Sequence, residues 1–107
     1  MKRGDVVWIL LEGRRGGEVK KSRPAVIVSN DASNKYLNRI QVVPLTSRIG
    51  KVYPSEALVE VRGEDHKAMA DQLMTVSKQR VDNQMGRVSE EGMLAIELAI
   101  RIQLGMA

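Results

Sequence analysis

Two strand-like runs of this chain each carry a residue suited to phosphate chemistry at one end. The first run, residues 23–31, opens with Arg23, and the second, residues 40–47, closes with the hydroxyl pair Thr46 and Ser47. Arginine keeps its charge at any working pH and can hold two phosphate oxygens at once. A hydroxyl can donate to an oxygen on which charge accumulates. On neighbouring strands these groups would converge on a phosphodiester, although the same residue types also serve as ordinary turn residues.

Other common reactive groups are scarce in the 107 residues. There is no cysteine, which removes disulfides, thiolate nucleophiles and zinc–thiolate sites. No acidic pair has metal-ligand spacing, and the glycines of residues 13–17 lack phosphate-loop spacing, so we expect neither a metal nor a cofactor. The one histidine, His66, follows Asp65 in a predicted turn and is expected at the surface. Aromatic residues make up only 3%, so we expect no broad base-stacking platform and place Trp8 in the core.

Length and charge set the class of protein. A chain of 107 residues with 43% apolar residues predicts one domain, residues 1–107. No apolar stretch approaches the roughly 20 residues that cross a bilayer, and the run 6–11 lacks a cleavage site, so we expect a cytoplasmic protein. Residues 1–53 carry 11 basic and 4 acidic side chains, net +7, whereas residues 54–107 carry 6 and 9, net −3. The basic half would attract phosphate backbones, but a solvated surface explains it equally well.

Short strands followed by one helix must position these residues. Residue preferences predict strands at 5–11, 24–29, 40–45, 57–61, 67–76 and 84–88. Residues 12–22 form a basic, glycine-rich loop, and residues 30–38 and 77–82 are each expected to contain a turn or one helical turn. The continuous apolar run of residues 24–29 predicts a central strand. This order predicts a mainly β (α+β) fold, a small bent sheet or barrel.

The C-terminal segment has the signals of a helix. Ser89 is the expected N-cap, the helix runs to about Leu104, and Gly105 suits its stop. Its apolar residues form more than one stripe, so the helix is either well buried or also meets a partner chain. We expect Glu97 and Arg101 to pair on the wet face.

Short motifs lie along the chain in a set order. They are Arg3-Gly4-Asp5-Val6-Val7-Trp8, Gly17-Glu18, Arg23-Pro24-Ala25-Val26-Ile27-Val28 with Ser29-Asn30-Asp31, Val42-Val43-Pro44-Leu45-Thr46-Ser47, Asp71-Gln72-Leu73-Met74-Thr75-Val76-Ser77-Lys78-Gln79-Arg80 and Gly86-Arg87-Val88. Each motif is weak alone, but their order and spacing resemble those of the MazF/PemK family, the toxins of toxin–antitoxin pairs. The resemblance covers nearly the whole chain.

The resemblance implies a small SH3-like barrel of short, mostly antiparallel strands with a C-terminal α-helix, acting as a homodimer. It implies a metal-independent, sequence-specific endoribonuclease that cuts single-stranded RNA, namely mRNA, and so inhibits translation and growth. The RNA's 2′-hydroxyl would attack the adjacent phosphate and leave 2′,3′-cyclic phosphate and 5′-hydroxyl ends. A cognate antitoxin with an acidic, flexible tail would cover the basic groove, and DNA would be bound only through the antitoxin complex.

Site residues follow from the same resemblance. It implies Arg23 as the catalytic arginine and Thr46 as its partner at the scissile phosphate. Supporting or RNA-bordering roles fall to Ser47, Glu18, Asp71 and Gln72. Because an arginine is a poor proton carrier, we expect it to act by electrostatic stabilisation, and Glu18 is a candidate proton acceptor if its loop closes.

Three positions depart from the family pattern, and two other functions stay open. Met74 stands where the family has arginine, Ser77 where it has aspartate, and Met69 where one branch has an arginine used for cleavage. These changes leave Arg23 and Thr46 intact but put base preference in doubt. The alternatives are a binding toxin of the same fold that acts on DNA gyrase, and a non-catalytic RNA-binding barrel.

Overall fold

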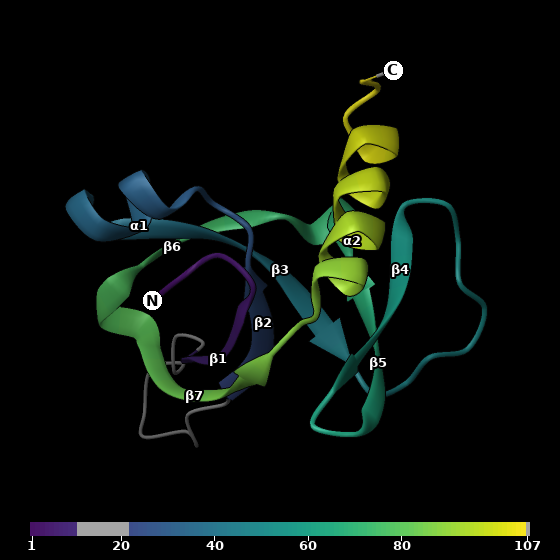
Figure 1. Cartoon of the computed structure of the whole chain (residues 1–107), viewed down its shortest axis with the longest axis horizontal. Helices are drawn as coiled ribbons and strands as arrows, with labels where there is room; N and C mark the ends of the chain where they lie inside the picture. The colour runs from purple at the N-terminus through teal and green to yellow at the C-terminus, as the bar shows by residue number, and fades with distance from the viewer. Residues whose placement is uncertain (11–21, 107) are drawn as a thin grey trace, which may run out of the picture.

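The chain forms a curled antiparallel sheet with a helix packed on one end of it (Figure 1). This computed structural model describes residues 1–10 and 22–106. Its strands are β1 (Asp5–Leu10), β2 (Ser22–Ile27), β3 (Arg39–Thr46), β4 (Glu56–Val61), β5 (Glu64–Met69), β6 (Met74–Ser77) and β7 (Val81–Arg87). Its helices are α1 (Asp31–Tyr36) and α2 (Glu90–Gln103), with 3₁₀ turns η1 (Ala70–Gln72) and η2 (Lys78–Arg80). The predicted mainly β fold with a C-terminal helix is confirmed.

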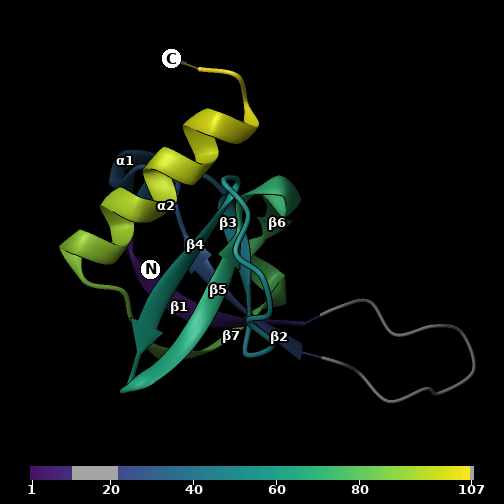
Figure 2. The ribbon, with the colours of Figure 1, turned by 90° about the vertical axis from the view of Figure 1, so that its right-hand side faces the viewer.

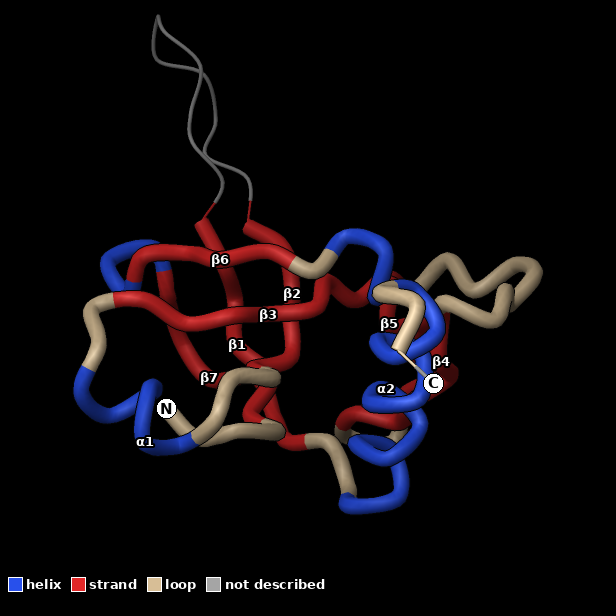
Figure 3. Tube along the Cα trace, turned by 90° about the horizontal axis from the view of Figure 1, so that it is seen from above, coloured by secondary structure: helices blue, strands red, loops and turns tan. Residues whose placement is uncertain are grey.

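Strand β3 pairs with three other strands of the sheet, β2, β5 and β6. The strand order is β4-β5-β3-β2-β1-β7, and β6 also pairs with β3. The first part of β3 pairs with β6, with Val42 opposite Met74, and its end pairs with β5, with Leu45 opposite Ala68. Figure 3 shows the result, in which β4 and β5 turn away from the layer that contains β1, β2, β6 and β7.

The predicted single strand at residues 67–76 is wrong. The chain forms β5, breaks at η1 and resumes as β6. The break is held by hydrogen bonds from Ala70 N to Ser55 O, 3.1 Å, and from Leu73 N to Ala70 O, 3.1 Å. Between the pairs Leu45–Ala68 and Val42–Met74 the chain advances six residues against three of β3, so one regular strand could not make both sets of contacts. The exposed Asp71, unusual in a strand, lies on this turn.

The central position of β2 is confirmed. The strand lies between β1 and β3, and Ala25, Val26 and Ile27 are all buried. Val26 packs in one cluster with Val43 on one face of the sheet, whereas Ala25 and Ile27 pack in a second cluster on the other face. Burial on both faces explains why this run has no polar alternation. The two clusters hold the start of β2 beside the end of β3.

The C-terminal helix begins and ends as its sequence predicts. Ser89 Oγ accepts a hydrogen bond from Gly92 N at 3.1 Å, and Gly105 has a φ of 69° just beyond the helix. The helix packs on β4 with Met93, Ile96 and Ala99 buried, as Figure 2 shows from the side. Its packing fixes the outer strands β4 and β5 against the rest of the sheet.

A second apolar row of α2 stays uncovered in the single chain. Leu94, Leu98 and Ile102, spaced four residues apart, are 65%, 59% and 47% exposed. Of the two expectations for this helix, full burial is therefore wrong. The expected pairing of Glu97 with Arg101 is also wrong, because Glu97 Oε2 lies 3.4 Å from Arg3 Nη2 and joins the helix to the N-terminal segment.

The remaining boundaries differ by a few residues from the predicted ones. Strand β7 begins earlier than expected, at Val81, and β5 begins at Glu64 because the preceding turn is tighter than expected. Arg62 and Gly63 have φ values of 53° and 80°, the conformation of a two-residue hairpin turn. The predicted loop at residues 12–22 lies outside the described residues except for Ser22, which opens β2. No described helix has the length and apolar character of a membrane span.

Candidate active site

The sheet brings Arg23 and Thr46 together. Strands β2 and β3 pair antiparallel with Ala25 opposite Pro44 and Val26 opposite Val43. Beyond this pairing Arg23 stands near the start of β2 and Thr46 at the end of β3, and both residues line one cavity. A cation and a hydroxyl therefore lie at the same end of two central strands, as the sequence predicted.

The Thr46 hydroxyl is oriented by the chain that follows it. Thr46 Oγ1 accepts a hydrogen bond from the backbone N–H of Arg48 at 3.1 Å. This contact uses a lone pair and leaves the hydroxyl proton free to donate to another oxygen. Ser47, the next residue, is exposed and lines the same cavity. The end of β3 thus offers two hydroxyl donors beside Arg23.

Gln72 connects Arg23 to the turn between β5 and β6. Arg23 Nη1 lies 3.5 Å from Gln72 Oε1, which is a long hydrogen bond. Gln72 Nε2 in turn lies 3.5 Å from the sulfur of Met69, whose side chain is buried. Asp71 precedes Gln72 on η1 and is exposed. The structure therefore brings Gln72 to Arg23 and leaves Asp71 at the rim, while Glu18 lies outside the described residues.

The three positions that depart from the family pattern have structural partners here. The Met69 sulfur accepts a hydrogen bond from the Gln72 amide, and Met74 packs against the second core cluster. Ser77 Oγ accepts a hydrogen bond from Gln79 N at 3.2 Å and caps η2. Each departure replaces a charged side chain with one that supports the local turn or core.

The candidate site is a cavity of about 370 Å³ at the end of the sheet where β2 begins and β3 ends. It lies among five strands, and the residues that line it are Trp8, Arg23, Pro24, Leu45, Thr46, Ser47, Glu64, His66 and Met85. Among these, Arg23 is the guanidinium cation and Glu64 the carboxylate. Its lining combines apolar side chains, among them Trp8 and Met85, with polar ones.

His66 is buried in this cavity wall, so its predicted surface position is wrong. The side chain is 4% exposed, and its Nδ1 lies 3.2 Å from the carbonyl oxygen of Glu64. The error arises because β5 begins before His66, whereas the sequence placed a turn there. The alternation with buried Ala68, two residues further on, was the available signal. Trp8, expected in the core, is half-buried and lines the cavity.

A second cation beside Thr46 is already neutralised. Lys67 is the cross-strand partner of Thr46, and its Nζ lies 3.3 Å from Glu56 Oε2. Both side chains are largely buried, which strengthens their attraction because screening by water is weak. Lys67 is therefore held in an ion pair and does not line the cavity, whereas Arg23 lines it and supplies its positive charge.

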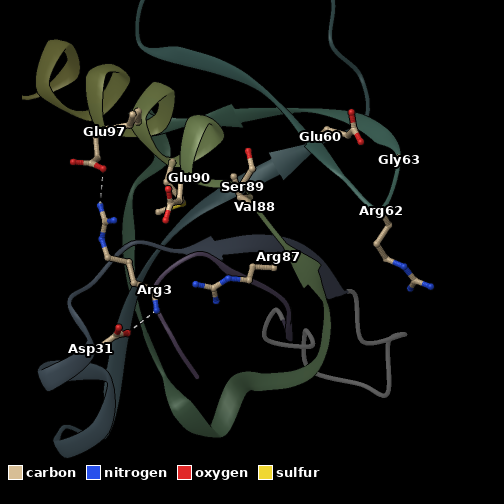
Figure 4. A pocket seen from close by; sticks show the side chains of 12 residues that line it. Arg3, Asp31, Glu60, Arg62, Gly63, Arg87, Val88, Ser89, Glu90 and Glu97 are labelled. Carbon is tan, nitrogen blue, oxygen red and sulfur yellow. Dashed lines mark hydrogen bonds and ion pairs between the residues drawn. The ribbon is translucent and has the colours of Figure 1, made fainter.

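A larger cavity, of about 1030 Å³, lies between the start of α2 and the β4–β5 hairpin (Figure 4). Its arginines are mostly occupied, since Arg3 pairs with Glu97 and Arg87 Nη1 lies 2.6 Å from Asp5 Oδ1. Four carboxylates line it against three arginines. Neither Arg23 nor Thr46 lines this cavity. The smaller cavity at the strand ends therefore fits phosphate chemistry better.

Comparison with known proteins agrees with this fold. Residues 2–104 match the family described as PemK-like, MazF-like toxins of type II toxin–antitoxin systems. The chain is 36% identical to endoribonuclease MazF9 of Mycobacterium tuberculosis over 115 residues, covering 99% of this chain and 98% of MazF9. The chain belongs to the PemK-like, MazF-like toxin family, whose members are endoribonucleases.

Solved structures share the fold over the full length. A MazE–MazF complex from Deinococcus radiodurans superposes with a TM-score of 0.84 at 25% identity, covering 100% of this chain and 97% of that one. A mycobacterial endoribonuclease in complex with its cognate antitoxin gives 0.83 at 24% identity, with the same coverage. These matches agree with the curled sheet and terminal helix described above.

Proposed function

We propose that this protein is the toxin of a type II toxin–antitoxin system and cuts single-stranded mRNA at specific short sequences without a metal ion. The observation that carries the proposal is that Arg23, near the start of β2, and Thr46, at the end of the neighbouring strand β3, line one cavity. Membership of a family of endoribonuclease toxins supports it. Cleavage of mRNA in the cytoplasm would stop translation and growth.

The chemistry follows from the groups that face the cavity. The 2′-oxygen of the RNA attacks the adjacent phosphorus as its proton passes to a general base, the bond from phosphorus to the 5′-oxygen breaks, and the departing 5′-oxygen takes up a proton from a general acid or water. The products are a 2′,3′-cyclic phosphate and a 5′-hydroxyl. Arg23 binds the non-bridging oxygens as their charge grows, and the Thr46 hydroxyl donates to one of them. These donors are positioned before the substrate arrives, so little reorganisation is needed during the reaction.

Gln72 and Ser47 have supporting roles in this scheme. The long Arg23–Gln72 contact of 3.5 Å holds the guanidinium near the cavity but leaves its donors available for phosphate. Ser47 supplies a second hydroxyl at the end of β3. Asp71, at the exposed rim of η1, would border the RNA groove, and Glu18 stays a candidate proton acceptor.

The partners of the protein follow from charge and exposure. The uncovered row of Leu94, Leu98 and Ile102 on α2 supports a homodimer, because burying such a row removes apolar surface from water. The basic N-terminal half would receive the acidic, flexible tail of a cognate antitoxin. Two solved relatives are complexes with an antitoxin or MazE. DNA would be bound only by the toxin–antitoxin complex.

The decisive experiment incubates folded, antitoxin-free protein with a long defined RNA in EDTA and maps the 5′ ends. We expect cleavage at a small set of related sequences and its loss in Arg23→Ala. Arg39→Ala is the matched control, because Arg39 is an exposed arginine at the opposite end of β3. Intact RNA with the wild-type protein would contradict the proposal. Inhibition of DNA gyrase that is indifferent to Arg23→Ala would point to the binding toxin, and RNA binding without cut products to the non-catalytic barrel.

A further inference from the structure

The cavity at the strand ends has more surface than the phosphate chemistry uses. Arg23, Thr46 and Ser47 account for its polar edge, whereas Trp8 and Met85 belong to an apolar wall. A volume of about 370 Å³ lies at the lower end of the range of ligand pockets. A flat aromatic group beside a phosphate would match this combination of an apolar wall and a cationic edge.

His66 adds a hydrogen-bonding group to the apolar wall. Its Nδ1 lies 3.2 Å from the Glu64 carbonyl, and a carbonyl only accepts, so Nδ1 is the donor and Nε2 an acceptor. Within the described residues Nε2 has no hydrogen-bond partner. No described side-chain nitrogen or oxygen is both inaccessible to water and without a partner. His66 lines the cavity although the residue as a whole is 4% exposed, and Nε2 is the acceptor that it can offer there.

A fixed acceptor in a narrow apolar wall is suited to selection among bases. A buried acceptor that binds a donor rejects an analogue without the donor, because the acceptor is then left unpaired. Glu64, which lines the same cavity, adds a second acceptor. Adenine, cytosine and guanine each carry an exocyclic amino group, and uracil has carbonyl oxygens in its place. Uracil offers one donor, its ring N3–H, so two acceptors leave one of them unpaired and disfavour uracil.

We propose that this cavity binds the nucleobase next to the scissile phosphodiester, with Trp8 against the base and His66 Nε2 accepting from its amino group. This inference rests on the proposed function, because it assumes that Arg23 and Thr46 hold the phosphate. It assigns part of the base preference to the sheet itself, in residues of β1 and β5.

Trp8 makes the inference testable without cleavage. It is the single tryptophan of the chain and lines the cavity, so tryptophan fluorescence reports its occupancy directly. The probes are short 2′-O-methyl RNAs, which lack the attacking hydroxyl, with each of the four bases placed in turn on either side of one phosphodiester. On one side we expect a saturable fluorescence change, with amino-bearing bases bound about tenfold more tightly than uracil, as one good base contact contributes.

Substitution of His66 separates base reading from general binding. His66→Ala should bind all four probes with nearly equal affinity, while His66→Gln, which keeps a side-chain acceptor, should retain part of the preference. Asp65→Asn is the matched control, since Asp65 is the exposed neighbour of His66 on β5 and does not line the cavity. It should keep the wild-type preference. Thermal melts establish whether each variant is folded. If His66→Ala does not fold, the binding measurements are made with His66→Gln alone.

Three results would overturn the inference. One is an unchanged preference in folded His66 variants, and another is RNA cleavage by a wild-type protein whose Trp8 fluorescence does not respond to any probe. The third is a uniform fall in the kcat of the His66 variants on all RNAs, with an altered pH profile, which would make His66 a proton carrier. The titratable groups that line the cavity are Arg23, Glu64 and His66. Selective binding without any cleavage would instead refute the proposed function and leave the base pocket standing.

Discussion

Arg23 and Thr46 line the same cavity, Arg23 near the start of β2 and Thr46 at the end of β3, and these two strands pair antiparallel. Their strands are packed on both faces, with Val26 and Val43 in one cluster and Ile27 and Val42 in the other. The candidate site therefore lies at the ends of two strands that are buried on both faces. This placement meets the usual requirement that catalytic donors be held in position before the substrate binds.

The Thr46 hydroxyl is predicted to supply a large part of the rate. Thr46→Val keeps the shape of the side chain and removes the hydroxyl, so kcat for RNA cleavage should fall about a hundred- to a thousandfold, as for a lost oxyanion donor. Thr46→Ser keeps the donor and should remain active. Single-turnover cleavage of one defined RNA would measure both. Equal rates for Thr46→Val and the wild type would show that the hydroxyl does not donate in the transition state.

The sequence was informative where local chemistry decides structure. Ser89 and Gly105 marked the ends of α2 because capping depends on residues within one turn. The apolar run of β2 marked a central strand because burial on two faces leaves no room for polar side chains.

The sequence was misleading where long-range pairing decides structure. The break at η1 accompanies a shift of register against β3 between β5 and β6, and no residue pattern within 67–76 contains that information. The predicted surface position of His66 was wrong for a related reason. Because the turn at Arg62 and Gly63 has only two residues, β5 begins before His66 and the side chain lies in the strand. The proximity of Gln72 to Arg23 likewise required the fold.

The packing of α2 on the sheet is predicted to dominate stability. Ile96 is fully buried in the cluster that joins the helix to β4, so Ile96→Ala should lower the free energy of unfolding by about 2–5 kcal/mol. Ile96→Val removes less and should cost about 0.5–1.5 kcal/mol. Urea unfolding followed by circular dichroism would measure both. A loss below 1 kcal/mol for Ile96→Ala would mean that the helix contributes little to the folded state.

The uncovered row of α2 is predicted to hold two copies of the chain together. Leu98→Asp places a charge in the middle of that row, so the protein should sediment as a monomer at concentrations where the wild type is a dimer. Glu91→Gln, in the exposed first turn of the same helix, should leave the dimer intact. Sedimentation at several concentrations decides the matter. A dimeric Leu98→Asp protein would place the interface on another surface.

Asp31 is predicted to stabilise the fold in a pH-dependent way. The backbone N–H of Arg3 donates to Asp31 Oδ1 at 2.7 Å, which is the largest cause of a pKa below the ordinary value for this carboxyl, with Asn34, Lys2 and Arg87 adding to it. A carboxyl whose folded-state pKa is lowered contributes stability above its ordinary pKa of about 3.9 and loses it as the pH falls through the lower, folded-state value. Asp31→Asn should therefore melt below the wild type at pH 7.

The difference in Tm between Asp31→Asn and the wild type should then shrink as the pH falls below about 4, because the unfolded-state carboxyl is protonated first and the folded-state carboxyl only at its lowered pKa. Parallel thermal melts between pH 7 and pH 2.5 would record this difference at each pH. Asp82→Asn, an exposed carboxylate on β7, provides the control for a general change of charge. A Tm difference that stays constant with pH would mean that the Asn34 and Arg3 contacts act through shape alone, without the charge of Asp31.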